Sequence, residues 1–115
     1  MSNEQQKLER VAKIRELNDR FRRTGIGGRF VMTGRVRALG QDALAQILQE
    51  VASYDEFSED NDPYGEHDFG AIRAGSVKLF WKIDYYDRSL EGGSEDPTNP
   101  AITTRVLTLM RAEEY

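Results

Sequence analysis

Residues 55–68 hold the side chains of this chain that are best suited to chemistry. The segment contains seven carboxylates and the one histidine of the sequence, His67, together with three turn-forming residues and no Lys or Arg. Clustered carboxylates attract hard cations or basic protein surfaces, and a histidine among them suits proton transfer. We therefore expect any binding site to lie in or near this segment, which we call the acidic loop.

Hard oxygen donors in the acidic loop stand at spacings of two and four residues: Asp60, Asp62, Glu66 and Asp68. Such clusters suit Ca²⁺ or Mg²⁺. An EF-hand loop that begins at Asp60 would place Gly65 correctly, but Tyr64 and Ala71 stand where oxygen ligands are required. One histidine also falls short of the two or three in common transition-metal sites. We predict no metal and no cofactor, and keep a metal-assisted hydrolase centred on residues 62–68 as an alternative.

The acidic loop also fits a structural interpretation, in which Asp and Asn side chains bond their own backbone. Pro63 and Gly65 favour a tight, exposed turn. A lone histidine between two carboxylates is more often a hydrogen-bonded structural residue than a general base. We therefore predict no catalytic residue and favour a non-enzymatic role. The candidate contact residues for a partner are Asp60, Asp62, Tyr64, Glu66, His67, Asp68, Tyr86 and Asp87.

Charge is distributed unevenly along the chain, whose formal net charge is −4. Residues 1–40 hold ten Lys or Arg and four acids, whereas residues 41–115 hold six Lys or Arg and sixteen acids. Either the basic first part packs beside the acidic loops, or one charged surface meets a partner of opposite charge. A protein with a basic surface is the favoured partner, and nucleic acid is less favoured.

Six arginines surround the glycine turn at residues 25–28: Arg20, Arg22, Arg23, Arg29, Arg35 and Arg37. Backbone amides beside arginines bind phosphate, so a nucleic-acid binder that uses these arginines is a second alternative. The dinucleotide fingerprint, however, needs Gly where Phe30 stands, and the sequence contains no Gly-Lys-Ser/Thr. A pI near 5 also argues against a general DNA binder.

A chain of 115 residues without cysteine predicts one domain that packing and hydrogen bonds must stabilise. No apolar run approaches the length of a membrane span, and the first ten residues are polar and charged. We expect a soluble, unprocessed, cytoplasmic protein with no membrane partner.

Two segments carry the apolar spacing of helices. The first, residues 3–23, has a stripe made of Leu8, Val11, Ile14, Leu17 and Phe21. Ser2 and Gln5 fit a capping box at its start, and the glycines at 25–28 end it. The second helix covers about residues 41–54, where apolar residues again share one face.

Period-two alternation predicts the strands. Residues 77–86 alternate an apolar face, which includes Trp81 and Tyr85, with a mixed face, and residues 68–74 form their hairpin partner. A short strand is expected at 29–33. Residues 102–112 also fit a helix, but their threonines and β-branched residues favour a strand. Two helices before three strands predict a single α+β domain over residues 1–115, with both helices packed on one face of a small curved antiparallel sheet.

Three blocks of sequence carry a resemblance to a known family: residues 62–70 (DPYGEHDFG), residues 80–87 (FWKIDYYD), and the last segment with TTRVLT and AEEY. Over residues 29–115 the chain resembles a small family of unknown function that is seen mainly in alphaproteobacterial genomes and their plasmids. The resemblance implies a bacterial intracellular origin, with a mobile element as one source. It supplies no catalytic residue.

These observations favour a non-catalytic interaction protein that presents two acidic segments, residues 55–68 and 84–96, to a basic partner. On a mobile element, that partner would be a host defence or nucleic-acid-processing protein, with carboxylates standing in for phosphates. The sequence gives no prediction of the oligomeric state.

Overall fold

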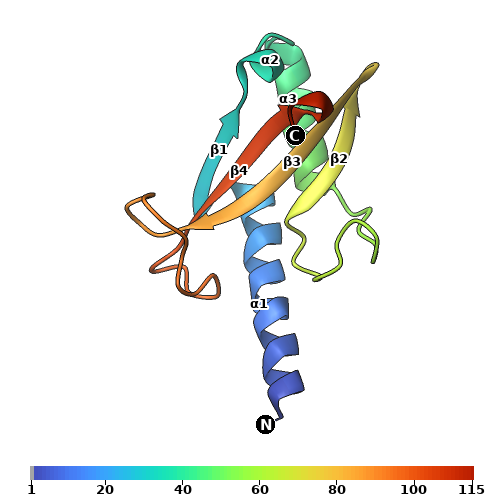
Figure 1. Cartoon of the computed structure of the whole chain (residues 1–115). Coiled ribbons are helices and arrows are strands. Elements are labelled where there is room, and N and C mark those ends of the chain that lie inside the picture. Colours follow the sequence, from blue (N-terminus) through green and yellow to red (C-terminus); the bar gives the residue numbers. More distant parts are fainter. Residues whose placement is uncertain (1) are drawn as a thin grey trace.

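Helix α1 (Asn3–Thr24) is the first element of the structure, a computed structural model that describes residues 2–115 (Figure 1). The predicted capping box is confirmed: the Ser2 hydroxyl accepts from the Gln5 amide, and the Gln5 side chain accepts from the Ser2 amide. Gly25 ends the helix in the left-handed conformation, with φ of 77°. Within residues 2–115, no helix combines the length and the apolar character that a membrane crossing requires.

The elements after α1 are β1 (Gly28–Met32), α2 (Gly34–Arg37), α3 (Gln41–Ser53), β2 (Phe69–Ala74), β3 (Val77–Tyr86), β4 (Thr104–Arg111) and the 3₁₀ turn η1 (Ala112–Glu114). Each predicted helix and strand forms within two residues of its expected bounds. The last segment is a strand, as favoured, although it begins at Thr104 and Ala112 belongs to η1. The short helix α2 and the turn η1 are additions to the prediction.

The four strands form one mixed sheet in the order β1-β4-β3-β2. The α+β class is confirmed, but the prediction of an antiparallel sheet is wrong for β1, which pairs in parallel with β4. A parallel pair needs a long connection between its strands, and the chain from α2 to β3 supplies it. At the start of this pairing, a Cβ on Gly28 would lie 2.1 Å from the Arg105 carbonyl oxygen, so only glycine fits there.

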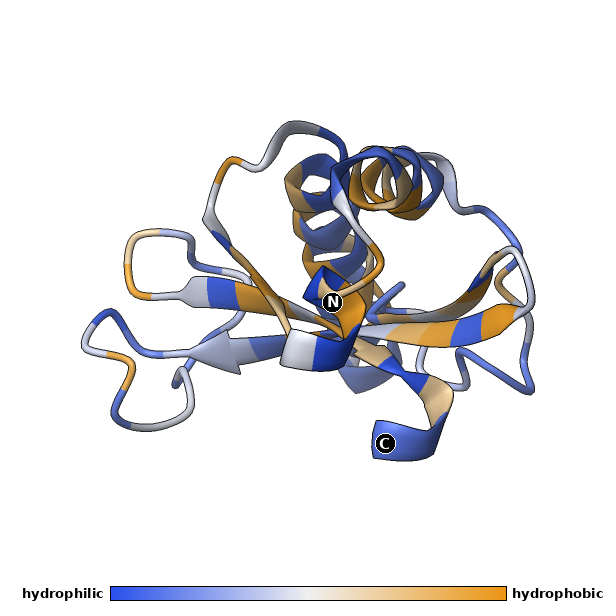
Figure 2. Ribbon diagram, turned by 90° about the horizontal axis from the view of Figure 1, so that it is seen from above, coloured by the Kyte–Doolittle hydropathy of each residue, from blue (hydrophilic) through white to orange (hydrophobic). Residues whose placement is uncertain are grey.

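Both long helices lie on one side of the sheet, and the C-terminal turn lies on the other (Figure 2). The core between helices and sheet contains Phe21, Val36, Ile47, Val51, Ile72, Leu79, Trp81, Ile83, Leu107 and Leu109. Trp81 is fully buried, and its indole packs so tightly on Gly70 that a Cβ there would lie 2.4 Å from Nε1. The two long loops, residues 54–68 and 87–103, lie on either side of α1 (Figure 1).

Candidate functional site

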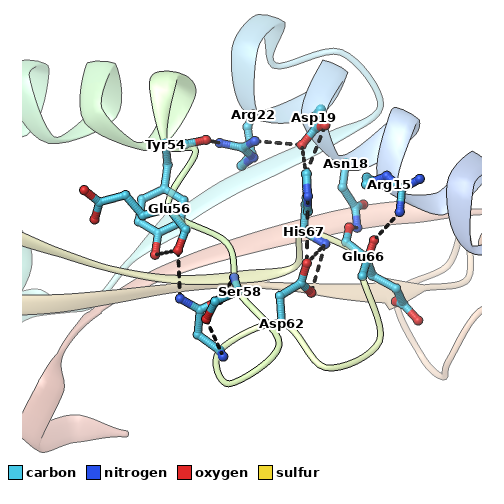
Figure 3. Close-up of polar contacts among 12 residues, drawn as sticks. Arg15, Asn18, Asp19, Arg22, Tyr54, Glu56, Ser58, Asp62, Glu66 and His67 are labelled. Atoms are coloured by element: carbon cyan, nitrogen blue, oxygen red, sulfur yellow. Dashed lines mark hydrogen bonds and ion pairs between the residues drawn. The ribbon is translucent and has the colours of Figure 1, made fainter.

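The acidic loop is fastened to helix α1 through two of its backbone carbonyls. The Arg15 guanidinium donates to the Gly65 carbonyl at 2.9 Å, and the Asn18 amide donates to the Glu66 carbonyl at 3.0 Å (Figure 3). Gly65 and His67 both adopt positive φ, 71° and 55°, which turns the chain sharply at this contact. The basic helix therefore packs beside the acidic loop and fixes its course.

His67 links the loop to α1 through a hydrogen-bonded carboxylate. Its Nδ1 lies 2.9 Å from an oxygen of Asp19, which also accepts from Arg22 at 2.7 Å. The imidazole stacks on the Phe57 ring at a centroid distance of 3.8 Å. Burial alone would raise the pKa of the Asp19 carboxyl, but the hydrogen bonds from Arg22 and His67 lower it below its usual value.

Both ring nitrogens of His67 face carboxylates of the chain. Its Nε2 faces the buried carboxylate of Asp62 at 3.8 Å. No Ser, Thr or Tyr hydroxyl of the described residues forms a hydrogen bond with the His67 ring. The histidine therefore holds the loop in place between two carboxylates.

Asp62 faces the interior of the loop, which corrects the expectation of an exposed turn at this position. The residue is 8% exposed. Its carboxylate accepts from the His67 amide at 3.2 and 3.3 Å, and its backbone closes turns with Ser58 and Gly65. A buried carboxylate needs such donors because burial without them is costly. The Asp62 side chain therefore stabilises the loop from within.

Arg22 connects the loop, both long helices and the core. It is 3% exposed, and its Nη1 donates to the carbonyls of Val51 and Tyr54 at 2.6 and 3.2 Å. These carbonyls end α3, so an arginine of α1 satisfies groups that a helix C-terminus leaves free. The guanidinium also lies 5.1 Å from the centre of the Trp81 ring.

A second buried network lies beneath Glu66. The Tyr85 hydroxyl donates to the Glu66 carboxylate at 2.6 Å and accepts from Asn18 at 2.8 Å. The Asn18 side chain accepts in turn from Arg105 at 2.6 Å. Burial, and next the hydrogen bond to Glu66, raise the pKa of Tyr85, so the hydroxyl stays protonated and donates. Glu66 is thereby tied to the sheet.

Asp68 completes the inner part of the loop, where β2 begins. Burial is the largest of the effects that raise the pKa of its carboxyl to about 6, and the nearby acids Glu66, Asp62 and Asp84 raise it further. Its backbone carbonyl accepts from the Ile83 amide at 2.8 Å. We call Asp62, Glu66, His67 and Asp68 the inner residues of the loop.

The remaining acids of the loop face solvent. Asp55, Glu56, Glu59 and Asp60 are exposed, and Tyr64 is 78% exposed at the tip. None of these four acids forms an ion pair with any residue in the range 2–115. Asn61 braces this part of the loop through the Ser58 amide at 2.8 Å and the Glu56 carbonyl at 2.9 Å. We call Asp55, Glu56, Glu59, Asp60 and Tyr64 the outer residues.

The two other predicted contact residues belong to a different part of the surface. Tyr86 is half-buried at the end of β3, on the sheet face opposite the long helices. Asp87 lies in the second loop, where its carboxylate accepts from the Ser89 hydroxyl at 2.7 Å and from the Glu91 amide at 3.1 Å. The second loop is held to α1 by an ion pair between Arg10 and Asp96 at 2.9 Å. The structure therefore separates these two residues from the acidic loop.

The arginines near the glycine turn differ in exposure. Arg22 is buried and occupied by the contacts described above, and Arg35 pairs with Glu113 at 3.2 Å. Arg20, Arg23, Arg29 and Arg37 are exposed. Arg22 is therefore not available for the phosphate contacts that the sequence predicted.

The described residues also contain no group of three or more His, Asp or Glu side chains that is arranged to hold a metal ion. The carboxylates of Asp62 and Glu66 are directed at the His67 amide and the Tyr85 hydroxyl.

Sequence reasoning missed the roles of three α1 residues: Asn18 and Asp19 bond the acidic loop, and Arg22 bonds Asp19 and the end of α3. The signal was present, because Asn18 and Arg22 follow Ile14 at steps of four and so share its buried stripe. A polar residue inside an apolar stripe needs a buried partner. The partner of Asn18 is the Glu66 carbonyl of the acidic loop, and the partners of Arg22 are Asp19 and the carbonyls at the end of α3.

The fold and the site define an α+β domain whose acidic loop is braced by a helix. The chain belongs to the family described as "Protein of unknown function (DUF3768)", whose model matches residues 32–114. Neither the curated proteins nor the solved structures compared with the chain gave a match.

Proposed function

We propose that the chain is a non-catalytic binding protein that presents the outer residues of the acidic loop to a basic surface of a partner protein. The observation that carries this proposal is the division of the loop. The inner carboxylates of Asp62 and Glu66 accept hydrogen bonds from donors of the chain itself, whereas the outer carboxylates have no ion pair among residues 2–115.

The bracing of the loop supports this proposal energetically. A loop that is already ordered loses little conformational freedom on binding, so more of the contact energy appears as affinity. The contacts of Arg15, Asn18 and His67 with the loop supply that order. Opposite charge also accelerates association and favours a basic partner over an acidic one.

Tyr64 gives the proposed surface an anchor. Exposed tyrosines that are surrounded by polar groups are enriched among the residues that contribute most to protein interfaces. Tyr64 is 78% exposed and follows the carboxylate of Asp60 by four residues. We expect its ring to enter a partner pocket while the acids pair with Lys or Arg at the rim.

The origin of the protein belongs to the same proposal. The resemblance described above, to a family seen mainly in alphaproteobacterial genomes and their plasmids, supports an alphaproteobacterial, cytoplasmic protein with a mobile element as one source. The partner would then be a host defence or nucleic-acid-processing protein whose basic surface binds phosphates.

Quantitative capture from an extract of the source organism tests the proposal. The variant carries Glu59→Gln, Asp60→Asn and Tyr64→Ala. A matched control carries Glu4→Gln, Glu9→Gln and Leu8→Ala on exposed positions of α1, which remove the same charge and a similar apolar side chain. We expect a basic protein that the wild type and the control retain and the loop variant loses. Equal capture by all three proteins, or no specific capture by the wild type, would contradict the proposal.

A further inference from the structure

Strand β2 forms one edge of the sheet and leaves alternate backbone groups unpaired. β2 pairs only with β3, in antiparallel register, and the sheet ends there. The Ile83 amide donates to the Asp68 carbonyl, so Asp68 and the residues two, four and six positions later point their backbone groups towards β3. The amides and carbonyls of Phe69, Ala71 and Arg73 therefore point to the free edge.

The surroundings of Ala71 support this assignment. Burial raises the pKa of the Tyr54 hydroxyl, and the Ala71 amide acts in the opposite direction because it faces that oxygen. Tyr54 follows α3 directly, so the amide points away from β3 and towards the helix and the acidic loop. No other strand of the described chain covers the edge there, and an added strand would replace the Tyr54 hydroxyl at the Ala71 amide.

A groove of about 510 Å³ runs between this edge and the start of the acidic loop. One wall is acidic and consists of Glu50 at the end of α3 with Asp55 and Glu56 of the loop. These three carboxylates form no ion pair within residues 2–115. Ala71 and Ile72 of β2 line the groove together with Tyr54.

The opposite side of the groove has the reverse charge. Arg73 and Lys78 line it and face each other in the β2–β3 register. A strand laid along β2 would point successive side chains alternately to the two sides. Its side chains on the helix side would meet three carboxylates, and those on the other side would meet two cations.

We propose that β2 accepts an extended segment of the partner protein as an added strand, with Lys or Arg at alternate positions facing Glu50, Asp55 and Glu56. Backbone hydrogen bonds to Phe69, Ala71 and Arg73 supply affinity, and the acidic wall supplies the choice of sequence. The inference rests on the proposed function, because the acidic wall includes outer residues of the loop. It adds the form of the partner, an extended basic strand, and the edge that binds it.

Amide hydrogen exchange of the wild-type protein tests the added strand directly. The probe is a synthetic peptide of about seven residues that alternates Thr and Arg, and the control peptide alternates Thr and Glu. We expect the Thr-Arg peptide to slow exchange at Phe69, Ala71 and Arg73 by at least about tenfold, since these amides would donate to the peptide backbone within a closed ladder. The amides of Gly70, Ile72 and Ala74 already pair with β3 and should change little.

A proline substitution provides the second test. Ala71→Pro removes the one amide that points to the middle of the free edge and breaks no bond to β3, a position where edge strands accept proline. Ala71→Val adds bulk but keeps the amide. We expect Ala71→Pro to weaken the Thr-Arg peptide by at least about fivefold relative to Ala71→Val, the loss of one hydrogen bond.

Several results would overturn the added strand. The Thr-Arg peptide could fail to bind, the Thr-Glu peptide could bind equally well, or the Thr-Arg peptide could bind without protecting the Ala71 amide. Protection of β2 that rises with protein concentration alone would assign the edge to a second copy of the chain. If the captured partner is lost by the outer-residue variant but kept by Ala71→Pro, the proposed function stands and the added strand fails. If both variants keep it, both proposals fail.

Discussion

Asp60 and Asp62 stand two residues apart in the acidic loop and have the same side chain, yet the molecule uses them differently. Asp62 is 8% exposed and accepts from the His67 amide, whereas Asp60 is exposed and forms no ion pair in the described chain. The same contrast separates the inner residues from the outer ones. The acids of this loop therefore form two sets. The inner set stabilises the loop, and the outer set faces solvent.

The largest effect is expected in the core on which the inner residues rest. Trp81→Ala should lower the free energy of unfolding by about 3–5 kcal/mol, because a fully buried indole leaves a cavity. Thermal and denaturant melts followed by circular dichroism measure the change. Trp81→Phe is the control and should cost less than about 2 kcal/mol, since it keeps a ring and removes an indole N–H without a hydrogen-bond partner. Equal losses would show that the cavity is not the cause.

Substitution of Arg22 tests how far the stability of the fold around the inner residues depends on α1. Arg22→Ala should destabilise the fold by about 3 kcal/mol, because Asp19 and the end of α3 lose a buried donor. The neighbouring Arg23→Ala, at an exposed position, should change stability by less than about 0.5 kcal/mol. Denaturant melts compare the two. A similar small effect for both would mean that the Arg22 network contributes nothing net.

The fold was predictable wherever one local pattern dominated. The capping box and the apolar stripe set α1, and the alternation around Trp81 set β3. The parallel pairing of β1 with β4 was not predictable. The five residues of β1 carry no signal for the direction of a strand that follows more than seventy residues later. Pairings of this kind depend on the whole chain.

The position of the candidate loop followed from composition, but its division did not. Nothing local distinguishes Asp60 from Asp62, since the inward turn requires a positive φ at His67 and contacts from Arg15 and Asn18. Those contacts join residues about fifty positions apart. Only the polar residues in the α1 stripe hinted at them.

The inner residue Asp68 should make the free energy of unfolding depend on pH, whereas the outer residue Asp60 should not. The pKa of Asp68 in the folded protein, about 6, lies above the ordinary value of 3.8, so the fold prefers the protonated carboxyl. That stabilisation is complete below about pH 4 and is lost as the pH rises through about 6. Asp68→Asn should therefore raise the free energy of unfolding by about 1 kcal/mol at pH 8, a figure reduced for partial solvent access, and by little at pH 4.

Melts of Asp68→Asn at several pH values test this sign. The exposed Asp60→Asn is the matched control and should show no such dependence. A gain that is the same at pH 4 and pH 8 would exclude titration of Asp68 as its cause.

The central claim is that outer residues bind and inner residues build. The most direct test compares two double variants. The outer variant carries Asp60→Asn and Tyr64→Ala, and the inner variant carries Asp62→Asn and His67→Ala. Melts measure their stability, and partner capture is measured at a temperature where both are folded. The outer variant should melt within about 0.5 kcal/mol of the wild type and lose the partner, whereas the inner variant should lose about 1–2 kcal/mol of stability. An outer variant that keeps the partner, or that is destabilised as much as the inner one, would contradict the account.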